Sequence, residues 1–464
     1  MLIYSETENI PTHTLKIAVI DVSAYAGEFT FDVFREMLQR RLHRLVPLHY
    51  RLLEIPLRLH HPVWLERSEL DLDCHLTRLR APAPGGRREL DQIIGEIAAS
   101  PLNRERPLWH MHFVEGLAGD RVAVVAKVHH ALADGVASAN LIARALDPNV
   151  IDDDLDPPLP PVSTPGTGEL LRAAARDHLD QLRQLPGLVR ATAAGVSRVR
   201  RRASERGPQP GLARNFHAPK TFLNHVISPG RRFASTSIAL SDIKETSKRL
   251  DVKINDLILT VTAGALRTLS LRYDGRAVEP MIAHVPSTLN ADPNRLTGNE
   301  LTALNLPLPI HVSDPLDRLR LTALATSLAK EDSELLGPMV EQSWAGYLPP
   351  IAQPLFHRMA RRGARNTMVN LVVSNVPGPR QRSGLDGALV SEIYSVGPLI
   401  TGSALNITVW SYVDQLNVAV LTDDLTVRDP HEVTDAILAA LVELRTAAGL
   451  SEELTPVRSA LSYV

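Results

Sequence analysis

Cysteine is almost absent from this sequence of 464 residues, which contains only Cys74. A single cysteine excludes a disulfide bond within the chain, and it is compatible with a reducing compartment. No histidine and asparagine stand near Cys74 in a pattern typical of a cysteine nucleophile. We therefore interpret this thiol as structural.

Charge of one sign and long apolar runs are also lacking. The formal net charge is −2, which does not favour nucleic-acid binding as the main activity. No apolar run reaches the roughly 18 residues that a membrane-spanning helix needs, and the first residues lack the basic and apolar regions of a signal peptide. These features predict a cytoplasmic protein, with peripheral contact to the inner membrane face as an open alternative.

Strand and helix patterns alternate from residue 13 to about residue 146, which favours an α/β fold. Strands are expected at 13–21 and 121–128, and helices at 29–45, 88–99 and 136–146. This length of chain suggests two or three domains. We predict an N-terminal domain over residues 1–150.

A proline-rich segment at 147–168 and a basic helical segment at 169–206 then form a predicted linker over residues 151–215. Pro186 and Gly187 are expected to break the helix. Its basic end, 198–202, and a second basic segment, 354–362, fit solvated helix faces. Attraction to anionic lipid or to cofactor phosphates is the alternative.

A second alternating region follows, and we assign it to a C-terminal domain over residues 216–464. Its expected strands lie at 232–240, 280–285, 371–374, 404–410 and 416–421, and its expected helices at 241–250, 257–271 and 430–448. Ser241 is expected to cap the first of these helices. The shared strand–helix rhythm of the two halves indicates a weak internal duplication.

The most informative motif is His129-His130-Ala-Leu-Ala-Asp134-Gly135, directly after the apolar strand at 121–128. A histidine held at the end of a buried strand can face a cavity, and its imidazole suits proton transfer near neutral pH. The first hypothesis is therefore that His130 is a general base. Two buried structural histidines are the alternative. A metal site is not predicted, because the chain offers no matching ligand cluster.

Three shorter motifs each have an ordinary structural explanation. Pro107-Leu108-Trp109 precedes the double histidine, and Trp109 is interpreted as a packing anchor. Asn255-Asp256 stands where a helix N-cap is expected. Ser374-Asn375-Val-Pro-Gly-Pro follows a predicted buried strand and fits a turn.

Together these motifs, with Gly298-Asn299, resemble the bacterial wax ester synthase/diacylglycerol acyltransferase family over nearly the whole chain. The double-histidine motif alone is shared with chloramphenicol acetyltransferase and with peptide-synthetase condensation domains. The resemblance implies an α/β fold of two chloramphenicol acetyltransferase-like domains. Each is a mixed sheet flanked by helices, and the active-site channel runs between the two.

The resemblance also implies a reaction, in which a long-chain acyl group passes from acyl-CoA to a diacylglycerol or a long-chain alcohol. His130 would take the hydroxyl proton and return it to the CoA thiolate, without an acyl-enzyme. No cofactor is implied, since acyl-CoA is a co-substrate. Neither the acyl chain length nor the oligomeric state follows from the motifs.

The same resemblance suggests roles for the other motif residues. Asp134 would point away from the imidazole and pair with an arginine, while His129 positions the loop. Gly135 would let the main chain come close beneath the histidine. The oxyanion donors would be Asn255 and the Ser374-Asn375 pair, and Asp256 would brace the two domains.

Some positions depart from the family pattern. The sequence begins with Met1-Leu-Ile-Tyr and does not show the Ser-x-x-Asp segment that usually opens the family pattern. His110 stands where an acidic residue is common, and Asn290 stands where an arginine is common. Another hydroxyl or amine acceptor, as in polyketide, glycolipid or condensation-type enzymes, is the alternative within the superfamily. A non-catalytic lipid-binding protein is the alternative outside enzymes.

Overall fold

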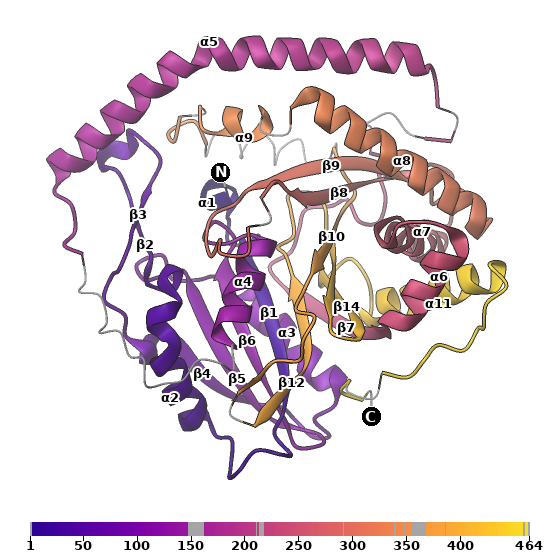
Figure 1. Cartoon of the computed structure of the whole chain (residues 1–464), viewed down its shortest axis with the longest axis horizontal. Helices are drawn as coiled ribbons and strands as arrows, with labels where there is room; N and C mark the ends of the chain where they lie inside the picture. Colours follow the sequence, from indigo (N-terminus) through magenta and orange to yellow (C-terminus); the bar gives the residue numbers. More distant parts are fainter. Residues whose placement is uncertain are drawn as a thin grey trace.

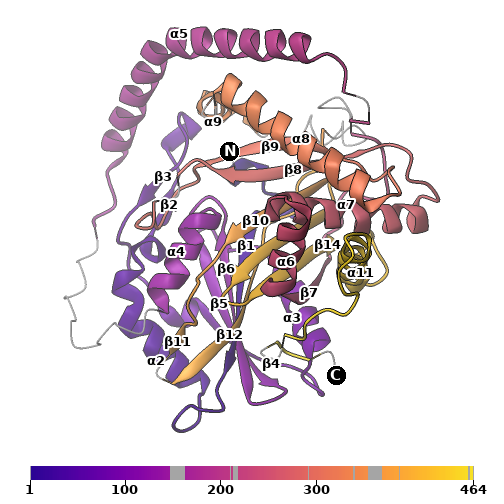
Figure 2. The same ribbon diagram turned by 45° about the vertical axis from the view of Figure 1, so that its right-hand side comes forward.

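Two six-stranded sheets with helices on their faces form the protein (Figure 1). The computed structural model describes residues 2–146, 162–209, 211–212, 218–290, 292–337, 340–347, 349–353, 368–385, 387–457 and 460–462. The sheets lie side by side, and each carries helices of its own half of the chain (Figure 2). This mixed α/β architecture with two sheet-containing halves confirms the predicted fold class.

The first sheet has the strand order β11-β12-β1-β6-β5-β4. Its strands are β1 (His13–Asp21), β4 (Leu76–Arg80), β5 (Trp109–Leu117), β6 (Arg121–His129), β11 (Gly384–Leu385) and β12 (Ala388–Val396). Helices α2 (Phe31–Arg41) and α4 (Gly135–Ala145) pack on one face, and α3 (Arg87–Ala99) packs on the other. Because side chains alternate along a strand, the strands contribute residues to the apolar layers on both faces of the sheet.

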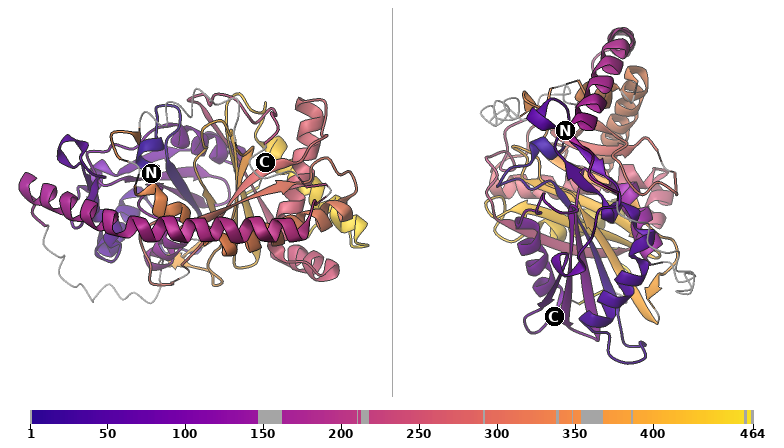
Figure 3. Two further views of the ribbon diagram at one scale, coloured as in Figure 1. Left: turned by 90° about the horizontal axis from the view of Figure 1, so that it is seen from above. Right: turned by 90° about the vertical axis from the view of Figure 1, so that its left-hand side faces the viewer.

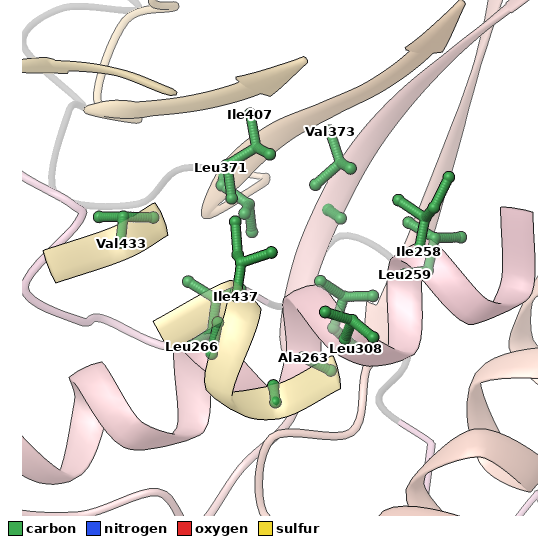
Figure 4. Packing of buried hydrophobic residues seen from close by; sticks show 14 of the residues in the cluster. Ile258, Leu259, Ala263, Leu266, Leu308, Leu371, Val373, Ile407, Val433 and Ile437 are labelled. Carbon is green, nitrogen blue, oxygen red and sulfur yellow. The ribbon is translucent and has the colours of Figure 1, made fainter. Parts of the chain in front are cut away.

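The second sheet has the order β7-β14-β13-β10-β8-β9. Its strands are β7 (Arg231–Ala239), β8 (Met281–Thr288), β9 (Leu301–Leu308), β10 (Leu371–Pro377), β13 (Leu405–Tyr412) and β14 (Gln415–Asp423). Its helices are α6 (Leu240–Leu250), α7 (Ile254–Tyr273), α8 (Pro315–Leu336) and α11 (His431–Ala447). Side chains of α7 and α11 pack against strand residues such as Leu371 and Ile407 (Figure 4).

The two halves are interlocked, because β12 comes from the second half of the chain and pairs with β1 of the first. Helix α3 also packs closely on β7: a Cβ added at Gly95 would lie 3.0 Å from the main-chain oxygen of Arg231. Arg87 of α3 pairs with Glu392 of β12, and both side chains are fully buried. The predicted domain boundaries stay a prediction, but the sheets do not divide the chain at one point.

The smaller elements lie outside the two sheets. They are α1 (Leu2–Ser5), α5 (Thr167–Arg206), α9 (Val340–Ala345), the hairpin of β2 (Arg51–Leu53) and β3 (Val63–Leu65), and 3₁₀ turns at 42–44, 46–49, 56–58 and 72–74. Helix α5 runs along much of the molecule's length (Figure 3). The break expected at Pro186 is wrong, since α5 continues through it. A helix can retain a proline at the cost of one main-chain hydrogen bond and a bend.

Helix starts in the second half also differ from expectation. Helix α7 begins after Lys253 with no capping side chain, so Asn255 and Asp256 lie in its first turn and are not N-caps. Helix α6 begins at Leu240, which places Ser241 inside it. The basic segment 354–362 and most of the proline-rich segment lie outside the described residues. No helix among the described residues is long and apolar enough to cross a membrane.

Candidate active site

Strand β6 delivers the two adjacent histidines to the centre of the molecule. His129, its last residue, donates its main-chain N–H to the carbonyl of Leu108 at 2.9 Å. His130 donates its own to the carbonyl of Thr12, also at 2.9 Å. Since neighbouring chain segments fix both main chains, neither imidazole depends on a mobile loop for its position.

The ring of His129 has both nitrogens engaged within the protein. Nδ1 accepts the main-chain N–H of Ala131 at 3.0 Å, so the ring proton lies on Nε2. Nε2 donates to the hydroxyl of Thr12 at 2.9 Å, and that hydroxyl donates to the carbonyl of Leu2. Burial lowers the pKa of His129 to about 3. This neutral, doubly bonded imidazole can support the loop but has no nitrogen left for a substrate.

The ring of His130 is arranged differently. The ring forms a hydrogen bond with the main chain of the same residue, and no hydrogen bond joins Nε2 to any described residue. Burial is the largest effect on its pKa and lowers it below the usual 6.5; the charge of Lys16 lowers it further, while Asp134 opposes this. The ring is therefore neutral near pH 7, and a neutral imidazole can accept a proton.

Asn299 holds the main chain of His130. Its Nδ2 donates to the carbonyl of His130 and lies 3.2 Å from the ring Nδ1. The Gly298-Asn299 pair contributed to the family resemblance, but the sequence suggested no role for Asn299. The only signal was the pair itself, in which Gly298 has a φ of +88° that favours glycine.

The loop that carries Asn299 joins β8 to β9 and reaches the double-histidine motif from the other half. Gly298 forms a parallel bridge with Ala133. Its N–H donates to the carbonyl of Leu132 at 2.9 Å, and its carbonyl accepts the N–H of Asp134 at 3.1 Å. Main-chain bonds thus fasten the two halves together beside His130.

Asp134 reinforces this junction with its carboxylate. One oxygen accepts the N–H of Ala137, which caps α4, and the other accepts the N–H of Glu300, both at 3.0 Å. Arg295 pairs with the same carboxylate at 2.9 Å, and both side chains are buried. The resemblance implied such an arginine without locating it.

Gly135 lies close to a side chain of the second sheet. A Cβ at this position would lie 3.2 Å from Cγ2 of Val376 in β10, and the φ of Gly135 is not positive. A close approach therefore joins α4 to Val376 of the Ser374-Asn375-Val376 motif, and the contact expected beneath the histidine stays a prediction. Two motifs far apart in the sequence meet at this glycine.

Asn255 and Asn375 also meet across the second half. Nδ2 of Asn375 donates to Oδ1 of Asn255 at 3.5 Å. Ser374 and Asn375 lie within β10, so the turn expected there is wrong. No hydrogen bond among the described residues connects this group to His130. Oδ1 of Asp256 is buried and has no hydrogen-bond partner among them.

Trp109 is the packing anchor that its sequence position suggested. It is 1% exposed, its Nε1 donates to the carbonyl of Leu48 at 2.7 Å, and His75 stacks on its ring with centroids 4.3 Å apart. Its neighbour Leu108 accepts the N–H of His129. The Pro107-Leu108-Trp109 motif therefore supports the histidine strand from behind.

Lys16 of β1 is a buried charged group that sequence reasoning missed. Its Nζ donates to Oγ of Ser395 at 2.6 Å and lies 5.2 Å from the centre of the Trp410 ring. Burial lowers its pKa to about 7. The sequence feature that could have revealed it is a single lysine inside the otherwise apolar stretch 15–20.

Cys74 is not activated as a nucleophile. The thiol of Cys74 donates to Asp71 at 3.2 Å, and this bond raises its pKa, which disfavours the nucleophilic thiolate. Within the described part of the chain, no three His, Cys, Asp or Glu side chains are grouped as metal ligands.

Comparisons with known proteins agree with the arrangement of these motifs. The family model for the wax ester synthase/diacylglycerol acyltransferase catalytic domain matches residues 1–258, and that for the C-terminal domain of the same family matches residues 297–445. A Mycobacterium tuberculosis protein provisionally named a diacylglycerol O-acyltransferase is 52% identical, over 100% of this chain and 98% of its own. An O-acyltransferase of Acinetobacter baylyi is 32% identical over 77% of this chain and 78% of its own.

Solved structures show the same fold. The wax ester synthase/diacylglycerol acyltransferase of Marinobacter aquaeolei has a TM-score of 0.68 at 25% identity, covering 97% of this chain and 98% of its own. The first condensation domain of the CDA synthetase, at 14% identity and a TM-score of 0.57, covers 98% and 95% and shares the fold alone. The chain belongs to the wax ester synthase/diacylglycerol acyltransferase family and is an O-acyltransferase.

Proposed function

We propose that this enzyme transfers a long-chain acyl group from acyl-CoA to the hydroxyl of a diacylglycerol or a long-chain alcohol. The observation that carries the proposal is the neutral, partly buried ring of His130, whose Nε2 has no protein partner among the described residues, at the junction of the halves. A starter condensation domain with a TM-score of 0.54 was solved in complex with C8-CoA. That complex supports a CoA thioester as the donor.

In the proposed reaction, Nε2 of His130 takes the hydroxyl proton as the alcohol oxygen attacks the thioester carbonyl carbon. The carbon–sulfur bond then breaks, and Nε2 returns the proton to the CoA thiolate. General-base assistance of this kind contributes about 10²–10⁴ in rate. His130 needs no nucleophilic serine or cysteine beside it, so an acyl-enzyme is not part of the scheme.

The remaining motif residues position this base and stabilise charge. The carboxylate of Asp134 is saturated by Arg295 and two main-chain N–H groups, so it acts through the loop that places Asn299 at His130. The Oδ1 of Asn255 accepts from Asn375, which leaves the amide hydrogens of Asn255 as candidate donors to the oxyanion. One such donor is worth about 10²–10³ in rate.

The test is CoA release from palmitoyl-CoA, measured with a diacylglycerol and separately with hexadecanol, for the wild type and for His130→Ala. Acceptor-dependent release that disappears in a folded His130→Ala variant supports both the reaction and the base. The better acceptor identifies the physiological class. A folded wild type with no acceptor-dependent release contradicts the proposed donor and acceptors, and a fully active His130→Ala variant contradicts the base.

A peripheral membrane association is proposed separately, from the surface of α5. Leu179, Leu182 and Val189 lie three and seven residues apart and are 54%, 65% and 49% exposed, so they form one apolar stripe. The last turns of this helix carry the basic segment 198–202. An amphipathic helix of this kind favours an anionic lipid surface.

Flotation with anionic vesicles tests this association. The wild type should float with anionic vesicles and less with neutral ones, and Leu182→Glu should reduce flotation. Equal recovery of the wild type with and without vesicles would contradict it.

A further inference from the structure

A cavity of about 110 Å³ lies between the first sheet and the helices that cover it. The sheet contributes Ala18 of β1 and Val124 and Ala126 of β6, while α2 and α4 contribute Met37 and Ile142. Apolar side chains form most of its wall. Such a space inside a core is unusual, because protein interiors are packed with few voids larger than a water molecule.

Three alanines line this cavity, and two of them, Ala18 and Ala126, lie on neighbouring strands. Ala18 stands opposite Val124, and Lys16 stands opposite Ala126, on neighbouring strands of the same sheet. Ala145 of α4 also lines the cavity. Larger apolar residues at these positions would fill the layer, as they do elsewhere in the core, so the space is specified by the sequence.

The cavity and the proposed base lie on the same face of the first sheet. Val124, Ala126 and Val128 alternate along β6 toward one face of the sheet, and His130 continues that alternation one residue beyond the strand. Four residues of strand separate Ala126 from His130, a distance of about 13 Å at the usual rise. Medium and long hydrocarbon chains can span this length.

Lys16 marks the end of the cavity nearer to the reaction centre. It lines the cavity, its amine donates to Ser395, and its charge acts on His130. Arg41 of α2 also lines the cavity, and its guanidinium donates to the carbonyl of Ala145. The other lining side chains are apolar, so the wall between these two charged groups matches a hydrocarbon chain.

We propose that this cavity receives the distal part of the hydrocarbon chain of the substrate whose reactive end lies at His130, and that it thereby sets the preferred chain length. This inference rests on the proposed function. The chain is either the acyl chain of the donor or the alkyl chain of the acceptor. Each buried methylene contributes about 0.8 kcal/mol, which corresponds to a factor of about four in binding.

The test fills the cavity and measures chain-length preference. Ala126→Leu should lower kcat/KM for palmitoyl-CoA by about 10- to 100-fold, as two to three buried methylenes are displaced, while hexanoyl-CoA keeps the wild-type value. Ala145→Leu fills the cavity from the helix side, in case the first variant does not fold. Ala143→Leu is the matched control, since Ala143 lies on the exposed side of the same helix.

Two series distinguish the sources of the chain. In the first, the acyl-CoA length varies with one alcohol; in the second, the alcohol length varies with one acyl-CoA. The cavity holds the substrate whose length profile shifts in the cavity variants. If neither profile shifts in variants that are folded and active, the inference is wrong and the proposed function stands.

Calorimetric binding gives a readout that does not require turnover. Wild type should bind palmitoyl-CoA or hexadecanol more tightly than the hexanoyl or hexyl analogue, and Ala126→Leu should lose this gain. If the wild type transfers no acyl group to either acceptor, the proposed function fails. The same binding difference would then still support the cavity as a chain site, and identical binding by wild type and variant would contradict it.

Discussion

The two halves of this protein share one architecture but differ in how completely their cores are filled. In the second half, α7 and α11 pack large aliphatic residues against the sheet (Figure 4), and the cavity in that layer measures only about 20 Å³. In the first half, the corresponding layer under α2 and α4 retains about 110 Å³. The empty space lies in the half that carries the double histidine, which indicates that the second half packs mainly for stability while the first leaves room beside the proposed base.

The largest expected effect is on activity and comes from the first half. His130→Ala should lower the rate of acyl transfer by about 10²–10⁴. Its melting temperature should stay close to that of the wild type, because no described partner of Nε2 loses a hydrogen bond. Steady-state kinetics measure the rate, and thermal unfolding measures the melting temperature as the control. A large loss of stability would show that His130 also supports the fold and would weaken the contrast between the halves.

The matching experiment in the second half should show the opposite outcome. Leu266 of α7 is fully buried in the filled core, and Leu266→Ala should lower the free energy of unfolding by about 2–5 kcal/mol. Activity per folded molecule should be retained. Urea unfolding measures the stability, and kinetics at urea concentrations below the unfolding transition measure the activity. An unfolding curve equal to that of the wild type would show that the core of the second half tolerates a void as readily as the core of the first half.

A smaller effect is expected where the halves meet. Asn299→Ala removes an amide hydrogen bond to the carbonyl of His130, and such a bond is worth about 0.5–1.5 kcal/mol. We expect kcat/KM to fall about two- to tenfold, with a changed pH profile because the ring loses its neighbour. An unchanged pH profile together with reduced stability would assign Asn299 a purely structural role.

The smallest effect concerns pH. The base must be neutral to accept a proton, and the pKa of His130 lies below 6.5, so kcat/KM should be constant near pH 7 and fall only in acid. Lys16 lowers this pKa through its positive charge. Lys16→Met should therefore raise the pKa and move the acid limb to higher pH. A limb that moves to lower pH, or does not move, would contradict the electrostatic link between the two residues.

The sequence predicted the elements whose residues alternate or repeat locally. The strand at 13–21 was found with its bounds, since β1 is apolar throughout apart from Lys16 and its polar ends. Strand β12 was missed because it buries polar residues such as Glu392, which is neutralised by Arg87 from a distant helix. Such compensation is not visible in a local pattern.

The prediction of the site was likewise restricted to residues that lie close together in the sequence. The double histidine and Asp134 form one contiguous motif, so they could be identified directly. Lys16 and Asn299 reach His130, and Arg295 reaches Asp134, only through strand pairing and through the loop that joins β8 to β9. Their partners lie more than a hundred residues away in the sequence. The tertiary fold decides those contacts, and no local spacing encodes them.

The pairing of β12 with β1 constrains the order in which the protein can be built. During synthesis the first sheet lacks its neighbour beyond β1 until the ribosome has translated residues 388–396. Until then, β1 presents an unpaired edge to other nascent chains, and such an edge invites aggregation. The sheet of the half made first is therefore complete only after residues 388–396 have been translated. A fragment that ends before β12 should depend on chaperones to avoid aggregation.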